Sequence, residues 1–294
     1  MKGFRLLSAR RHGERIAREA GFDRFPVDPF AIAEAEEIVV EAKAPGVKGV
    51  SGGIVFNDAG AGIFYATDIR NEGFQRFTVA HELGHYFLEG HPEEILRTAP
   101  VHMSRAGFAQ GASSIELEAD HFASGLLLPS GLVKRALGAN QVGLQGIVDL
   151  ADAACASLTA SAIRAAECSD YPIAVIVSSG MEVRYAFLSD AFKELDRLQF
   201  LRKGMPLPRT HTYAFNADPA NVAQGERACG QTSLAAWFSC RRSLDLDEEI
   251  VGLGKYGLTL TVLSSDELAH ADDEEADEEA ELVRSWTPRH AYGR

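Results

Sequence analysis

The stretch FTVAHELGHYFLEGH, residues 77–91, contains two histidines four positions apart and a glutamate directly after the first. Apolar residues recur beside them at spacings of three and four, which predicts one face of an α-helix that ends near Gly90. Residues i and i+4 lie one above the other on a helix, so His81 and His85 can bind one metal ion together. Glu82 lies about 100° around the axis, where it can reach a water at the metal.

Two positions compete for the role of third ligand. His91 stands at the spacing of the last histidine in H-E-x-x-H-x-x-G-x-x-H, but the glycine that this motif needs for a sharp turn is a leucine here. The segment SSIELEADHFASGLLLP, residues 113–129, instead predicts a second helix on which Glu116 and Asp120 are one turn apart. Glu116 would then bind the metal, and Asp120 would orient a ligand histidine through its free ring nitrogen.

Another carboxylate on the predicted second helix is Glu118. It lies about 200° from Glu116 around the helix axis, so the two cannot both bind the metal. We therefore interpret Glu118 as a solvated helix charge.

Composition and charge limit the classes of protein. The chain has 294 residues, 46% of them apolar, which is enough for two domains. Its net charge is −13, and the acidic segment at residues 266–281 contributes ten negative charges, so −13 + 10 leaves −3 for the rest. A body so close to neutral lacks the basic character of a dedicated nucleic-acid binder.

The sequence also bears on location. No apolar run approaches the roughly 20 residues of a membrane span, and the N-terminus is charged where a signal peptide has an apolar centre. We therefore expect a cytoplasmic protein without membrane contact. The four cysteines are too sparse for a disulfide framework and are interpreted as reduced thiols.

The N-terminal part predicts two helices and a small sheet. The first helix covers residues 8–21, and the second covers residues 28–38 with Asp28 as its cap and Pro29 at its first position. Short β-branched and aromatic runs between Gly, Asn and Asp predict three strands, the last two joined by a hairpin turn: residues 37–42, 52–56 and 62–68.

Residues 150–164, LADAACASLTASAIR, resemble a helix-turn-helix in which Ser157 opens the would-be recognition helix. Phosphate contacts need cations, and Arg164 is the only one between Gln141 and Ala166. A structural helical layer is therefore favoured over direct DNA binding.

A second domain of mixed α and β structure is predicted after Tyr171. Residues 172–190 alternate apolar and other side chains around a Ser-Gly turn, which is typical of a β-hairpin. The glycines of GLGKYG, residues 252–257, precede a strand where a dinucleotide site needs a helix, so they predict a tight hairpin. The remaining expected elements are a helix at 190–201, a strand near 211–216 and a strand pair within 248–263.

RFTVAHELGHYFL, residues 76–88, followed by ELEADHFASGLLLP, residues 116–129, resembles the ImmA/IrrE family of HExxH zinc metallopeptidases. The resemblance is close over roughly residues 70–130. Asp120 stands where the family usually has asparagine, a change that preserves a short hydrogen-bonding side chain. The resemblance implies three metal ligands, with Glu82 as the catalytic acid/base: His81, His85 and Glu116.

The resemblance also implies a substrate and a reaction. Family members cleave helix-turn-helix transcriptional repressors and thereby switch on stress-response or mobile-element genes. The metal would be Zn²⁺, with Mn²⁺ as the alternative. Peptide hydrolysis also needs a hydrogen-bond donor for the tetrahedral oxyanion, and the sequence does not rank the three candidates: Tyr65, His102 and His121.

We therefore expect an α+β protein in four parts. Residues 1–130 would form the zinc metallopeptidase domain, zincin-like and mainly helical with a small sheet. It would be followed by a helix-turn-helix-like segment at 131–169. An α+β regulatory or docking domain is expected at 170–265, and it resembles GAF sensors in position and strand content. The last part would be an acidic C-terminal tail at 266–294. Two rival hypotheses are a ligand-sensing adaptor with a structural metal and a DNA-binding regulator that uses the 142–164 helices.

Overall fold

The computed structural model describes most of the chain: residues 2–43, 49–58, 60–67, 71–105, 114–138, 143–241 and 244–265. It is a mixed α+β protein with two small sheets, as the sequence predicts. The chain divides into two compact units, Met1–Ala139 with Ile147–Ala165, and Asn140–Gly146 with Ala166–Arg294. The predicted acidic tail, 266–294, lies outside the described residues.

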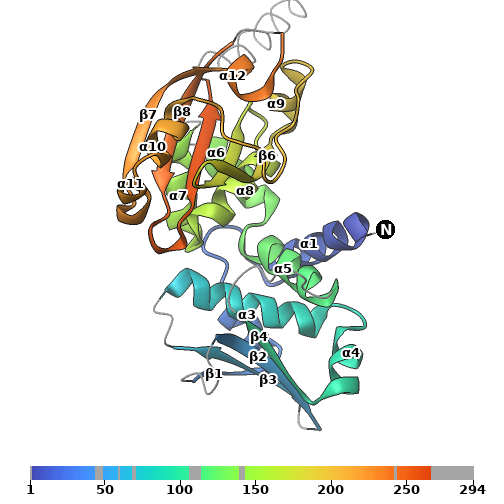
Figure 1. The fold of residues 1–294 in the computed structure, drawn as a ribbon. Coiled ribbons are helices and arrows are strands. Elements are labelled where there is room, and N and C mark those ends of the chain that lie inside the picture. Colours follow the sequence, from blue (N-terminus) through green and yellow to red (C-terminus); the bar gives the residue numbers. More distant parts are fainter. Residues whose placement is uncertain are drawn as a thin grey trace, which may run out of the picture. The chain divides into compact units, whose positions relative to one another are not determined.

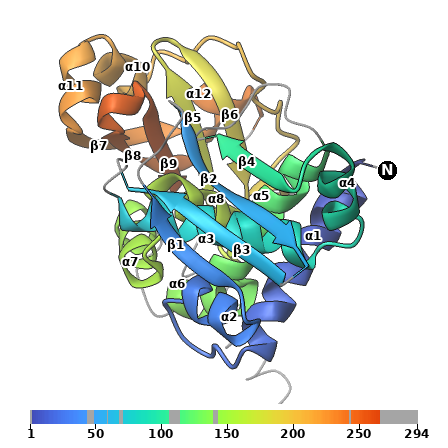
Figure 2. The ribbon, with the colours of Figure 1, turned by 90° about the horizontal axis from the view of Figure 1, so that it is seen from below.

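The first unit contains α1 to α6, most of α7 and most of α8. Its sheet has the order β1-β3-β2-β4, with β1 parallel to β3 and the other pairs antiparallel (Figure 2). The elements are α1 (Lys2–Glu19), α2 (Pro29–Ala35), β1 (Val39–Lys43), β2 (Val50–Asn57), β3 (Gly60–Ala66), α3 (Glu72–Phe87), α4 (His91–Thr98), β4 (Val101–Arg105), α5 (Ser114–Leu127), α6 (Ser130–Gly138), α7 (Leu144–Ala154) and α8 (Leu158–Cys168).

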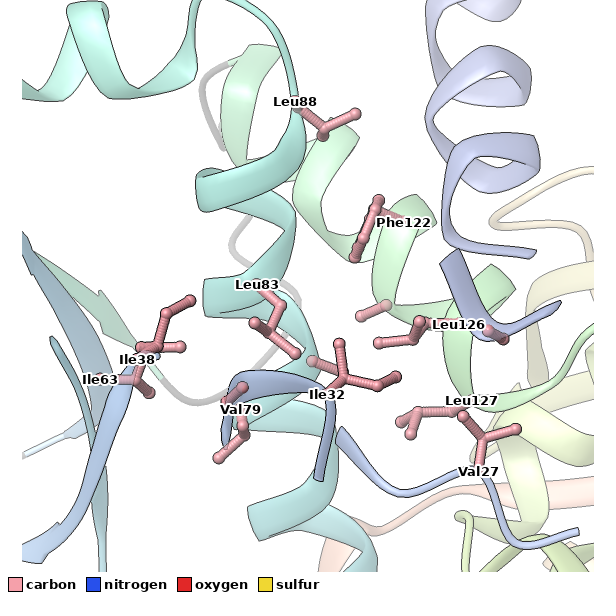
Figure 3. Close-up of a cluster of buried hydrophobic side chains, with 14 of the residues drawn as sticks. Val27, Ile32, Ile38, Ile63, Val79, Leu83, Leu88, Phe122, Leu126 and Leu127 are labelled. Carbon is pink, nitrogen blue, oxygen red and sulfur yellow. The ribbon is translucent and has the colours of Figure 1, made fainter. Parts of the chain in front are cut away.

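Helix α3 is the central layer of the first unit, between the sheet on one side and α5 with α1 on the other (Figure 1). Asn71 caps α3 by accepting a hydrogen bond from the Phe74 amide, and Asp28 caps α2 in the same way. Figure 3 shows the buried apolar cluster that holds these layers together, with side chains from α2, α3, α5 and the sheet: Ile32, Ile38, Ile63, Val79, Leu83, Phe122 and Leu126.

Glycines let three helices approach closely. A Cβ on Gly84 of α3 would lie 3.1 Å from the Ala119 Cα of α5. A Cβ on Gly125 of α5 would overlap the Arg10 carbonyl oxygen of α1, and one on Gly13 would overlap the backbone of α5. These small residues bring the helix backbones together at the level where α3 carries its histidines.

Helices α7 and α8 form the predicted helix-turn-helix-like pair, which bends by 114°. Ser157 accepts a hydrogen bond from the Ala160 amide at the start of α8. Arg164 of α8 is buried, and it donates to the Leu128 carbonyl and to Glu14 of α1. Its guanidinium is therefore engaged inside the first unit.

The second unit contains a five-stranded antiparallel sheet with the order β6-β5-β9-β8-β7. The hairpins predicted around Gly180 and at residues 252–257 are both present, but the second is not tight, because residues 253–258 connect its strands and include the short helix η1. The elements are β5 (Ala174–Ser179), β6 (Glu182–Leu188), α9 (Asp190–Glu194), α10 (His211–Asn216), α11 (Pro219–Gln224), β7 (Arg227–Ser233), α12 (Leu234–Phe238), β8 (Asp245–Gly252), η1 (Gly254–Tyr256) and β9 (Thr259–Ser264).

Two predictions for the second unit are wrong in detail. Residues 211–216 form α10, where a strand was expected, and the helix expected at 190–201 ends at Glu194. Glu248 of β8 accepts hydrogen bonds from the Thr210 hydroxyl and the Thr212 amide, which satisfies the start of α10.

Within the described ranges, no single helix has both the length and the apolar character to cross a membrane, although the bent pair α7 and α8 passes that test jointly.

Gly125→Ala is expected to destabilise the protein by at least about 2 kcal/mol, because the added methyl group would force α1 and α5 apart. Chemical denaturation measures the change in the free energy of unfolding. Gly131→Ala in α6 is the matched control, since its Cβ would meet only the Arg135 side chain at 3.8 Å. Equal stability of the two variants would contradict the tight crossing.

Candidate metal centre

Three predicted ligands from two helices converge. His81 and His85 come from α3 and Glu116 from the first turn of α5, and one donor atom from each lies within 4.8 Å of the others. The two Nε2 atoms are 3.2 Å apart. Glu116 Oε2 lies 3.5 Å from His81 Nε2, and Glu116 Oε1 lies 3.3 Å from His85 Nε2.

The spacing of the two histidines fits a tetrahedral zinc ion. Donor atoms about 2.0–2.1 Å from one zinc ion at tetrahedral angles lie about 3.3–3.4 Å from one another, close to the 3.2 Å between the two Nε2 atoms. The Glu116 carboxylate faces both rings, with a different oxygen near each Nε2. The donor set of two imidazoles and one carboxylate is also one that zinc prefers. The Glu116 Oε1 atom is buried and lies 3.3 Å from His85 Nε2 and 3.0 Å from His102 Nε2.

His81 lies between two carboxylates. Its Nδ1 is 2.9 Å from Asp120 Oδ1, which is the contact proposed from the sequence to orient a ligand histidine. Burial would lower the pKa of His81, but hydrogen bonds to Asp120 and Glu116 outweigh burial and raise that pKa to about 10. Without a metal ion, His81 therefore holds an extra proton at neutral pH.

The other two donor side chains have the protonation that metal binding requires. Burial lowers the pKa of His85 to about 3, so its ring is neutral. Burial would raise the pKa of Glu116, but hydrogen bonds from three histidines outweigh it and hold the pKa below its usual range. The carboxylate is therefore ionised.

Glu82 is completely buried beside the cluster. Neither of its carboxylate oxygens accepts a hydrogen bond of normal geometry from a described residue, although the Ser104 hydroxyl is near. Burial raises the pKa of Glu82, against the opposing effect of the His81 charge. A raised pKa makes the carboxylate a stronger base, which favours its use as a proton acceptor.

His102 is the one oxyanion candidate that the structure brings to the cluster. Its Nε2 lies 3.0 Å from Glu116 Oε1, and its ring centroid lies 4.5 Å from that of His85. Tyr65 instead packs edge-on against Phe30, and His121 lies 3.1 Å from Arg10 Nη2.

Strand β4, which positions His102, was missed by the sequence analysis. His102 and Ser104 face inward, whereas the alternating Val101 and Met103 are exposed. Two-residue alternation was therefore present, but with the polar residues inside. That pattern is the reverse of an ordinary half-buried strand.

His91 is not among the three converging donors. Gly90, with φ of 84°, turns the chain out of α3, and His91 then begins α4. The ring of His91 packs against that of His85, with ring centroids 5.2 Å apart. The interpretation of Glu118 as a solvated charge is wrong. Its side chain is buried because α1 covers it, with Arg5 donating to its carboxylate at 3.0 Å.

A protein-family model matches the part of the chain that contains His81, His85 and Glu116. Residues 36–153 match the model of the IrrE N-terminal-like domain, Peptidase_M78, which is consistent with the resemblance to the ImmA/IrrE family that the motifs indicate. No curated protein matches the chain.

A solved structure with a similar fold is described as a Mycobacterium tuberculosis transcriptional regulator. Its TM-score is 0.54 at 14% sequence identity, and the match covers 90% of this chain and 77% of that one. At this identity the likeness concerns the fold alone.

Glu116→Ala is expected to lose most of its zinc, because it removes one of three donors, whereas His91→Ala should still bind one equivalent at saturating zinc. Equilibrium dialysis followed by metal analysis measures the stoichiometry. The reverse outcome, zinc lost from His91→Ala and kept by Glu116→Ala, would make His91 the ligand.

Zinc binding at neutral pH should release about one proton, because His81 must lose its Nε2 proton to bind while its Nδ1 proton stays with Asp120. Apparent affinity should therefore rise about tenfold per pH unit through the neutral range and level off above the His81 pKa. Calorimetry in buffers of different ionisation enthalpy counts the protons. A count near zero at pH 7 would contradict this protonation state.

Proposed function

We propose that this chain is a zinc-dependent endopeptidase that cleaves a helix-turn-helix transcriptional repressor. The observation that carries the proposal is the convergence of His81, His85 and Glu116 beside a completely buried Glu82. Three protein donors leave a zinc ion one open coordination position, which is typical of catalytic sites, whereas structural zinc sites use four.

The residues around the site suit peptide hydrolysis. A zinc ion, when bound, supplies Lewis acidity that polarises the scissile carbonyl and makes water a stronger acid. Glu82 would accept a proton from the attacking water on its carboxylate and then pass it to the departing amine. Its raised pKa makes the carboxylate a stronger base, which serves the first of these steps.

We assign the oxyanion donor to His102. Its imidazole lies beside Glu116 and His85, and an N–H there can donate to negative charge that develops on the substrate oxygen. The short strand β4 holds this ring from the edge of the sheet, so the donor and the two metal-binding helices belong to one unit.

The substrate class is inferred from the family. Its members cleave helix-turn-helix repressors, and a protein of similar fold is described as a transcriptional regulator, which supports a role in the control of stress-response or mobile-element genes. Cleavage would then take place in the cytoplasm. We further propose a zincin-like layout for the first unit and a GAF-like regulatory or docking role for the second, with its five-stranded sheet.

Two rival functions have less support. A ligand-sensing adaptor with a structural metal gives no role to a general base beside the ligands, yet Glu82 is there. A DNA-binding regulator built on the 142–164 helices needs exposed cations, and Arg164 is 97% buried.

Glu82→Gln should keep stoichiometric zinc but cleave its repressor at least about 100-fold more slowly, because it removes the general acid/base. Purified protein would be incubated with repressors encoded nearby, with and without chelator, and the products identified by mass spectrometry. Glu89→Gln, the same change at an exposed position just after α3, is the matched control. Cleavage by Glu82→Gln at the control rate would refute the mechanism.

A further inference from the structure

We propose that His91 and Glu118 form a relay that fixes the ring of the metal ligand His85: a hydrogen bond joins His85 to His91, and a longer polar contact joins His91 to Glu118. The inference rests on the proposed metal site, and it assigns a positioning role to two residues that do not bind the metal. His91 Nδ1 lies 3.2 Å from His85 Nδ1, and His91 Nε2 lies 3.6 Å from Glu118 Oε2. All three side chains are buried.

A metal ion at His85 Nε2 determines every proton in this relay. Coordination uses the lone pair of Nε2, so the ring proton of neutral His85 must be on Nδ1. That N–H can donate only to an unprotonated His91 Nδ1. The proton of His91 must then be on Nε2, where it points to the carboxylate of Glu118.

Glu118 is itself held in place. Ser114 donates from Oγ to Oε1 at 2.7 Å, and Arg5 donates to Oε2 at 3.0 Å. Glu118 therefore accepts from α1 and from its own helix, and its Oε2 also lies 3.6 Å from Nε2 of His91, the first residue of α4. Its carboxylate is fixed on the side of α5 away from the metal.

The two ligand histidines thus have different outer partners. His81 has a carboxylate, Asp120, directly on its Nδ1, whereas His85 reaches Glu118 through the neutral ring of His91. Both arrangements fix the tautomer and the ring plane of the ligand. The relay also gives a role to His91, which stands at the spacing of a third metal ligand but does not converge with the three donors.

Replacing His91 should weaken metal binding through His85. His91→Phe keeps an aromatic ring but removes the acceptor, and zinc affinity should fall about 10- to 100-fold. His91→Asn offers an amide oxygen near the position of Nδ1, so its loss should be several-fold smaller. Chelator competition measures both affinities. The visible absorption of the Co²⁺-loaded protein should shift in His91→Phe, because the ring of His85 is no longer held.

The matched control is His12→Phe. His12 packs against Phe87 and Phe122 in the same unit, and its replacement should leave zinc affinity and the cobalt spectrum unchanged. Glu118→Met and Glu118→Gln test the relay from its other end: the first removes the acceptor for His91 and should weaken binding more than the second, which keeps one. Circular dichroism confirms that each variant is folded.

Two results would overturn the relay. One is wild-type zinc affinity and an unchanged cobalt spectrum in folded His91→Phe. The other is equal loss in His91→Phe and His91→Asn, which would mean that His91 acts only through packing. If His91→Phe does not fold, the Asn variant and the two Glu118 variants decide. Because the readouts are metal binding and spectra, failure to cleave any repressor would reject the proposed function and leave this result standing.

Discussion

The close contact between α3 and α5 at Gly84 and Ala119 is the constraint on which the metal centre depends. His81 and His85 flank Gly84 on one helix, and Glu116 and Asp120 flank Ala119 on the other. A side chain at position 84 would separate the backbones and move the carboxylates away from the imidazoles. The motif HELGH thus carries its ligands and the small residue that lets a second helix reach them.

Pairing of opposite charges offsets the free-energy cost of burying so many ionisable groups close together. Asp120 and Glu116 hold a charge on His81, and Glu118 is neutralised by Arg5 from α1. Glu82 is the exception, a buried carboxyl group that accepts no well-formed hydrogen bond from any described residue. Such a group destabilises the fold unless it is protonated, which is a common compromise where chemistry takes place.

The sequence predicted the two ligand-bearing helices because each buries a continuous apolar stripe, as Leu83 and Phe122 do. It failed where tertiary contacts reversed a local rule. Glu118 lies about 200° around the helix from Glu116, so we expected its side chain to be in solvent. In the structure α1 covers that side of α5, and Arg5 donates to the Glu118 carboxylate. The polar side chains of strand β4 face the interior, which a local alternation rule assigns to apolar residues. The start of α10 depends on a hydrogen bond from the Thr212 amide to Glu248, which is 36 residues away in the sequence, so no local pattern predicts it.

The contact of Arg164 with Glu14 bridges 150 positions of the chain, and the same guanidinium holds the carbonyl of Leu128 just after α5. Helix α8 thereby fastens the first helix to the end of the helix that carries Glu116. A fragment cut at residue 130 or at 153 would keep every ligand and yet leave these two acceptors without their cation. During synthesis, therefore, the candidate metal centre gains this support only after the ribosome has passed well beyond Glu116.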